Sequence, residues 1–292
     1  VLNAGAGDDV LNGGRGDDVL NGLTANNVVN NPNLITRGNS LYSIVQGSNW
    51  TWTEAEAEAT KIGGHLVTIN DAEENKFLDD TFTYHVSTKN IKGDFAVSNP
   101  EETWPGHWIG LTDHAVEGEW KWVSGEEVTF TNFGPNGPDN NYSSIGGQDF
   151  AILTHSYLHS RESTGGWDDL TNTDRAYRGI AEIPFVQRGD SAYVIVKGPT
   201  WEEAEANAVK LGGHLVTIND EEENNYLTQI FGDESNFYNN QQSTHDNYYI
   251  GLENVSGKWK WASGEAFEYS NWGWDQPAFD GTKVEIKLGK DE

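Results

Sequence analysis

The chain has 292 residues, of which 46 are acidic and 18 are basic, so its formal net charge is −28. Such a charge repels nucleic-acid backbones and anionic membranes, and no apolar run reaches the roughly 18 residues that a membrane helix needs. The absence of cysteine excludes disulfides and thiolate metal sites, whereas clustered carboxylates favour divalent cations. The sequence also lacks methionine and opens in the middle of a repeat, so we expect it to be a fragment of a longer protein.

A nine-residue repeat occupies the start of the chain, where Gly-Asp-Asp-Val-Leu-Asn occurs twice with a spacing of nine. The pattern resembles the RTX (hemolysin-type) calcium-binding nonapeptide, in which glycines permit tight turns. The resemblance implies that Asp9 and Asp18 are Ca²⁺ ligands, whereas a flexible Gly/Asp linker is the alternative. We therefore predict that residues 1–22 form the end of a β-roll and that the Asn-rich residues 23–38 form a linker.

A longer repeat follows. Residues 52–75 recur 149 residues later, at 201–224. The shorter motifs Trp/Tyr-Ile-Gly-Leu and Gly-x-Trp-Lys-Trp also occur twice in the same order. We therefore expect one fold to be used twice, at 39–186 and at 189–292.

The predicted elements of the first copy alternate between helices and short strands. A strand at 40–45, with a counterpart at 191–196, precedes a helix at 53–62 that the Gly63-Gly64 pair ends. The Asn70-Asp71 pair is a good N-cap for a second helix. The remaining elements follow in chain order: strands at 108–111 and 120–123, a long loop at 132–149, and strands at 150–153 and 179–183 that flank a turn at 167–169. The second copy has a strand at 284–288 but lacks the Trp-Asp-Asp turn and the closing strand.

Together these ordered motifs resemble the C-type lectin-like domain. They include Gly-Gly-His-Leu-Val, Trp-Ile-Gly-Leu, Trp-Lys-Trp, a Pro-bearing long loop and a late Trp-Asp-Asp. The resemblance implies an α+β fold with two helices, small antiparallel sheets and a long loop. It implies a tandem of such domains, of which the one at 39–186 is complete and the one at 189–292 is incomplete.

The resemblance also implies a calcium site in the long loop. Sugar-binding members of the family hold Ca²⁺ with a Glu-Pro-Asn or Gln-Pro-Asp triplet, a later Glu and an Asn-Asp pair. The matching oxygen-bearing residues of this chain are Asp139, Gln148, Asp168 and Asp169. Gly137 stands where the family has its first ligand, so that ligand is lost, although nearby Asn136, Asn140 or Asp149 could substitute for it. The alternative is an acidic loop whose Asp and Asn residues only shape turns.

A second, structural calcium site in the family would fall on the Val67 carbonyl, Glu73 and Glu182. The alternative for Glu73 is a first-turn acid that the helix dipole favours. The second copy offers four further candidates, which are Gln276, Asp280, Val216 and Glu222. Because Ala278 replaces the acid of the triplet, we expect the second long-loop site to be weak or empty.

No nucleophile, base and orienting group can be named together, so we expect no enzyme activity. The predicted function is that of an extracellular, calcium-dependent carbohydrate-binding or adhesion module of a bacterial RTX-type secreted surface protein. Its partner would be a glycan or glycoprotein, without nucleic acid and without membrane insertion. Candidates to stack on a sugar ring are Trp104, Tyr142 and Trp167. The alternative is a calcium-rigidified structural subunit of a surface layer, sheath or filament that associates with itself.

Overall fold

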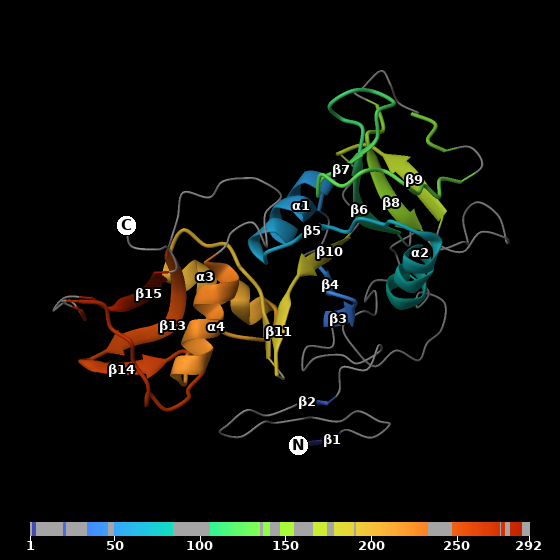
Figure 1. Ribbon diagram of the computed structural model, residues 1–292. Helices are drawn as coiled ribbons and strands as arrows, with labels where there is room; N and C mark the ends of the chain where they lie inside the picture. Colours follow the sequence, from blue (N-terminus) through green and yellow to red (C-terminus); the bar gives the residue numbers. More distant parts are fainter. Residues whose placement is uncertain are drawn as a thin grey trace, which may run out of the picture. The chain divides into compact units, whose positions relative to one another are not determined.

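The structure is a computed structural model with two compact units (Figure 1). It describes residues 2–3, 20–21, 34–45, 50–83, 106–134, 137–140, 147–154, 166–173, 178–189, 191–232, 247–274, 276–277 and 281–287. We call the described residues up to Ile195 unit 1 and those from Val196 onwards unit 2. None of the helices in these residues is long and apolar enough to span a membrane.

The two described pieces of the nonapeptide region pair with each other. Strands β1 (Leu2–Asn3) and β2 (Leu20–Asn21) are parallel, and Leu2 lies opposite Leu20. The two partners are 18 residues apart, which is twice the repeat period. Parallel pairing at a multiple of the period is the arrangement expected where repeats stack as coils of a roll.

Unit 1 is built on one sheet with the strand order β3-β4-β10-β6-β8-β9. All of its pairings are antiparallel except β10 with β6. The strands are β3 (Leu34–Arg37), β4 (Ser40–Ile44), β10 (Arg178–Pro184), β6 (Gly106–Thr112), β8 (Phe150–Thr154) and β9 (Gly166–Leu170). Two short strands join it at the side, β5 (His65–Leu66) on β10 and β7 (Lys121–Trp122) on β6.

The helices of unit 1 begin at side chains that satisfy their free N–H groups. Helix α1 (Trp52–Lys61) starts at Thr51, which forms a capping box with Glu54. Helix α2 (Ala72–Leu78) starts at Asp71, as the sequence predicts, and continues into a π-helical turn, η1 (Asp79–Thr83). The N-cap at Asp71 therefore fixes where α2 begins, and with it which side chains of α2 are buried: Glu74, Asn75 and Leu78.

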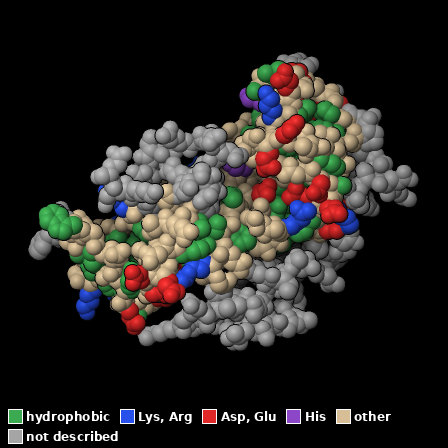
Figure 2. Space-filling model, viewed as in Figure 1, with side chains coloured by type: hydrophobic (Ala, Val, Ile, Leu, Met, Phe, Trp, Pro, Cys, Tyr) green, Lys and Arg blue, Asp and Glu red, His purple; other side chains and the backbone are tan. Residues whose placement is uncertain are grey.

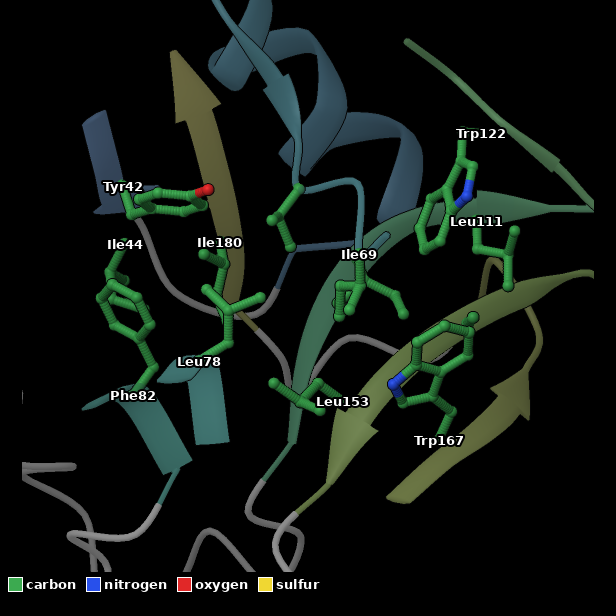
Figure 3. Packing of buried hydrophobic residues seen from close by; sticks show 13 residues of the cluster. Tyr42, Ile44, Ile69, Leu78, Phe82, Leu111, Trp122, Leu153, Trp167 and Ile180 are labelled. Carbon is green, nitrogen blue, oxygen red and sulfur yellow. The ribbon is translucent and has the colours of Figure 1, made fainter. Parts of the chain in front are cut away.

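The core of unit 1 joins α2 and η1 to the sheet (Figure 3). Trp167 from β9 is 1% exposed and meets Trp122 from β7 edge to face, with ring centroids 5.7 Å apart. Ile69, Leu111 and Leu153 fill the space beside these rings, and each is buried. Burial of side chains of this size contributes about 1.5–3 kcal/mol each, so this cluster stabilises the position of β9.

Unit 2 repeats the first part of this design. Its helices are α3 (Trp201–Lys210) and α4 (Glu221–Phe231), and its strands form a sheet of order β14-β13-β15. The strands are β13 (Asn247–Val255), β14 (Lys258–Trp261) and β15 (Lys283–Lys287). The described residues of unit 2 contain no strand at the positions that β9 and β10 have in unit 1.

The α+β fold class is confirmed, but three local expectations differ from the structure. Residues 34–37, assigned to a linker, form β3 because they pair with β4. The expected turn at 167–169 lies inside β9, which pairs with β8 along its whole length. The expected strand at 191–196 is shorter, since β12 (Ser191–Tyr193) forms a hairpin with β11 (Val186–Arg188) in unit 1.

Candidate metal centre

Strand β9 brings two carboxylates to the described part of the long loop. The Asp169 side chain is buried, and its carboxylate accepts hydrogen bonds from the backbone N–H groups of Asp139 (3.0 Å) and Asn140 (2.8 Å). The strand thus holds residues 137–140 against its own end. Asp139, Asp168 and Asp169, which the sequence analysis grouped, do lie together.

Gly137 lies beside these carboxylates. A Cβ atom at Gly137 would lie 3.7 Å from Asp168 Oδ1, 3.7 Å from Asp169 Oδ1 and 3.7 Å from Phe133 Cδ1. Those are ordinary contact distances, so the position has room for a side chain. Two carboxylate oxygens therefore face the residue that stands where the family has its first ligand.

Gln148, the fourth candidate, binds the backbone of Asp169. Its side chain is 8% exposed, and its Nε2 donates to the Asp169 carbonyl at 2.7 Å. Its Oε1 is buried and has no hydrogen-bond partner in the described structure. A buried oxygen without a donor is costly, and a Ca²⁺ ion is a partner that such an oxygen suits.

The electrostatics of Asp169 favour the same assignment. Burial raises the pKa of its carboxyl above the ordinary value, although the hydrogen bonds from Asn140 and Asp139 oppose the shift. Burial thus disfavours the ionised carboxylate of Asp169, and a bound cation would offset that cost in free energy. No three His, Asp or Glu side chains of the described ranges gather closely enough to hold a metal by themselves. The site fits Ca²⁺ through carboxylates combined with an amide oxygen.

One buried acidic residue, Asp113, was not identified from the sequence. Asp113, at the end of β6, is 4% exposed; its Oδ2 accepts from Gly118 N at 2.9 Å, and its Oδ1 is buried without a partner in the described structure. Burial raises the pKa of Asp113, and nearby Glu117 and Asp149 raise it further. The signal in the sequence is an acid directly after an apolar strand, Leu111-Thr112-Asp113.

Loop residues surround Asp113. Asp149 O accepts from Asp113 N at 3.2 Å, and Asp149 Oδ2 lies 2.8 Å from His114 Nδ1. A Cβ at Gly147 would lie 2.8 Å from Asp149 Oδ1 and 2.7 Å from Asn140 Oδ1, so these oxygens converge on a glycine. Asp149 and Asn140 therefore place two side-chain oxygens together at Gly147, and the Asp149 backbone binds the backbone of Asp113.

The predicted structural site has different neighbours from those expected. The Val67 carbonyl accepts from Gly110 N at 2.9 Å, and Glu73 is exposed on the first turn of α2. Glu182 Oε1 accepts from the Tyr42 hydroxyl at 3.3 Å, and the same hydroxyl donates to Glu74 Oε1 at 2.7 Å. The structure thus links Glu182 to Glu74 rather than to Glu73.

The described residues of unit 2 present few ligands for a cation. Gln276 and Glu222 are exposed, the Val216 carbonyl accepts from Gly251 N, and Asp280 lies outside the described residues, as do Asp9 and Asp18. Asn254 stands in the place of Asp113, and its Oδ1 accepts from Gly257 N at 2.8 Å. Lys283 stands in the place of Phe150, and its Nζ lies 3.6 Å from the centroid of the Trp201 ring.

Comparison with known proteins agrees with this geometry. The Lectin C-type domain matches at residues 48–176 and 197–287, and the RTX calcium-binding nonapeptide repeat matches at residues 1–29. An alpha-N-acetylgalactosamine-specific lectin of Patiria pectinifera is 34% identical over 47% of this chain and 70% of its own length. A perlucin-like protein of Mytilus galloprovincialis is 27% identical over 47% of this chain and 72% of its own.

A mouse scavenger receptor C-type lectin carbohydrate-recognition domain is 25% identical, with a TM-score of 0.39 over 52% of this chain and 94% of that one. C-type lectin domains and RTX repeats are both calcium-binding, so Ca²⁺ is the cation of both parts of the chain. Because the Lectin C-type domain covers more than half of its residues, the chain belongs to the C-type lectin domain family.

Proposed function

We propose that unit 1 is a calcium-dependent carbohydrate-recognition module. The single observation that carries this proposal is that the Oδ1 atoms of Asp168 and Asp169 both lie beside Gly137, the position of the family's first ligand. The lectin name of the Patiria pectinifera relative supports the ligand class. The family supports binding without catalysis.

In this proposal Asp139, Gln148, Asp168 and Asp169 hold the ion, and Asp113 with Asp149 and Asn140 holds a second ion nearby. A bound Ca²⁺ supplies coordination positions that vicinal sugar hydroxyls can fill. The carboxylate oxygens that face Gly137 accept hydrogen bonds from the same hydroxyls, and the half-buried Phe133 ring borders the space. Trp167 does not stack on the sugar, because it is 1% exposed and lies in the core.

The ligand is proposed to be a neutral glycan or glycoprotein. Asp and Glu side chains are spread over the face shown in Figure 2, and the formal charge of −28 disfavours anionic partners. The RTX repeats support an extracellular setting, and we propose that the chain is part of a secreted bacterial surface protein that acts in adhesion. The structural alternative, a calcium-rigidified subunit that self-associates, remains a competing proposal.

A glycan array tests the proposal. The full chain is applied in buffered Ca²⁺ and again in chelator, together with a variant that carries Asp168→Ala and Asp169→Ala. We expect binding to neutral glycans that disappears in chelator and in the variant. Binding that persists in chelator would contradict the calcium dependence. No binding, while the chain sediments as large calcium-dependent assemblies, would favour the structural alternative.

A further inference from the structure

His114 is an exposed residue whose imidazole contacts the carboxylate of Asp149. Its Nδ1 lies 2.8 Å from Asp149 Oδ2, and its backbone N–H donates to Thr112 Oγ1 at 3.1 Å. The side chain of His114 is 70% exposed, whereas that of Asp149 is 13% exposed. An ionised carboxylate can only accept hydrogen bonds, so Nδ1 of His114 is the donor.

Ring stacking and a backbone hydrogen bond hold this imidazole in place. The ring of His114 is stacked on that of Phe150, with centroids 5.4 Å apart and planes 28° apart. Phe150 is 5% exposed, and its ring lies 4.8 Å from that of Trp52 at the start of α1. The preceding residue, Asp113, donates from its backbone N–H to Asp149 O at 3.2 Å. The exposed imidazole is therefore fixed to the core of unit 1, and the Asp149 carboxylate is fixed to the imidazole.

The other oxygen of the Asp149 carboxylate lies near Asn140. A Cβ at Gly147 would lie 2.8 Å from Asp149 Oδ1 and 2.7 Å from Asn140 Oδ1, so both oxygens are close to one point. Asn140 Oδ1 also accepts from Gln148 N at 2.9 Å, and Asn140 N donates to Asp169 Oδ2 at 2.8 Å. With Oδ2 bound to the imidazole, Asp149 thus presents Oδ1 on the side of Asn140.

Unit 2 keeps the backbone contact of this region without the imidazole–carboxylate pair. Asn254, in the place of Asp113, donates from its backbone N–H to Thr282 O at 2.8 Å. Thr282 therefore stands in the place of Asp149. The residue after Asn254 is Val255, which has no polar side-chain atom. The pair is thus not needed to form the backbone contact, which leaves the Asp149 carboxylate as the group on which the imidazole acts.

We propose that His114 is a positioning residue for calcium in unit 1. It donates to Asp149 Oδ2, and this contact keeps Asp149 Oδ1 beside Asn140 as a ligand for the second ion. Groups that hydrogen-bond to a metal-ligating carboxylate orient it, and their loss weakens metal binding roughly 10–100-fold. The inference rests on the proposed function, in which Asp149 and Asn140 are ligands, and adds a residue that does not touch the ion.

Two substitutions of His114 separate the hydrogen bond from the ring stack. His114→Phe keeps a ring over Phe150 but has no donor, whereas His114→Asn keeps an N–H donor close to the place of Nδ1 and has no ring. In calorimetric Ca²⁺ titration of the full chain we expect His114→Phe to bind about tenfold more weakly, and His114→Asn to restore most of the affinity. The melting temperature of His114→Phe in chelator should equal that of the parent, because a contact with an exposed partner contributes little to stability.

Asp149→Ala shows whether His114 acts through the carboxylate. The nonapeptide repeats also bind calcium, so the difference between the parent and Asp149→Ala first identifies the binding step that depends on Asp149. In the double variant, His114→Phe should weaken that step no further, because the partner of His114 is already absent. His214→Phe is the matched control: His214 Nδ1 lies 2.6 Å from Glu205 Oε1 and its side chain is 44% exposed, but Glu205 is not a proposed ligand. It should leave calcium binding unchanged.

Four results would overturn the inference. His114→Phe could bind calcium as the parent does, His114→Asn could be as weak as His114→Phe, or the effects of His114→Phe and Asp149→Ala could add in the double variant. Asp149→Ala could also leave the titration unchanged, which would show that Asp149 is not a ligand. A failure of the proposed function is a different observation, since the parent chain would then bind no glycan or bind it equally in chelator.

Discussion

Trp167 Nε1 donates a hydrogen bond to Asn75 Oδ1 at 2.7 Å, and this contact ties the strand that carries the site carboxylates to helix α2. Both residues are buried, at 1% and 3% exposure. Asp168 and Asp169 directly follow Trp167 on β9. The positions of Asp168 and Asp169, the proposed metal ligands, therefore depend on the hydrogen bond between Trp167 and Asn75 in the core.

The change Trp167→Phe tests that dependence. It removes the indole donor of the buried hydrogen bond to Asn75, so we expect a loss of about 1–3 kcal/mol in the free energy of unfolding. Calcium affinity should also fall. Urea denaturation and calorimetric Ca²⁺ titration measure the two effects. Trp274→Phe, at a 95% exposed position, is the matched control and should change neither. Equal stability of the two variants would show that the hydrogen bond does not anchor β9.

Removal of the two carboxylates of β9, Asp168 and Asp169, should have different effects on stability. Asp169 holds the backbone of Asp139 and Asn140, so Asp169→Ala should lower both calcium affinity and the melting temperature in chelator. Asp168→Ala should lower calcium affinity with a smaller effect in chelator. Differential scanning calorimetry with and without Ca²⁺ distinguishes the two losses. Asp80→Ala, on the exposed side of η1, serves as the control. Identical melting curves for both variants in chelator would contradict the assigned anchoring role of Asp169.

The pKa shift of Asp113 predicts how its contribution to stability changes with pH. Burial raises its pKa in the folded protein, so the metal-free folded state holds this proton more tightly than the unfolded chain does. The contribution of Asp113 to stability is therefore present below its ordinary pKa and is lost as the pH rises through the raised pKa. Asp113→Asn should raise the melting temperature in chelator at pH 7 and leave it unchanged near pH 3.

The same variant should lose part of the stabilisation that calcium gives, because an ionised ligand is gone. Asn254 occupies the corresponding position in unit 2 and accepts from Gly257 N, so Asn fits the backbone geometry. Thermal melts of the parent and the variant in chelator at pH 3 and pH 7, and in Ca²⁺ at pH 7, make the comparison. A variant that is less stable than the parent in chelator at pH 7 would show that Asp113 is not destabilising when ionised.

Local patterns were sufficient to predict much of unit 1. The helix expected at 53–62 is Trp52–Lys61, and the N-cap at Asp71 was placed correctly because both depend on residues within one turn. The α+β class followed from the family resemblance and was confirmed. Ca²⁺ as the cofactor was confirmed in the same way.

Other features depend on contacts between distant parts of the chain. The polar string Trp167-Asp168-Asp169 has no apolar alternation, and it is a strand because Trp167 is buried among rings from β7 and the loop. The choice between Glu73 and Glu74 depends on the phase of α2, since adjacent helical residues point about 100° apart. The hydroxyl of Tyr42, 32 residues away, selects Glu74. No pattern within the helix indicates that contact.

Gly137→Glu gives the sharpest test of the long-loop site. The backbone at Gly137 has room for a side chain, since an added Cβ would meet its nearest neighbours only at 3.7 Å. Two of those neighbours are the Oδ1 atoms of Asp168 and Asp169, so the new carboxylate would stand beside them. If Ca²⁺ binds there, the added ligand should tighten it at least tenfold, which corresponds to about 1.4 kcal/mol. If no ion binds, a third carboxylate adds only repulsion and lowers the melting temperature. Gly137→Gln controls for bulk, because it adds an oxygen without a charge. Calorimetric Ca²⁺ titration of the parent and both variants decides, and an unchanged or weaker affinity of the Glu variant would mean that these oxygens do not form a metal site.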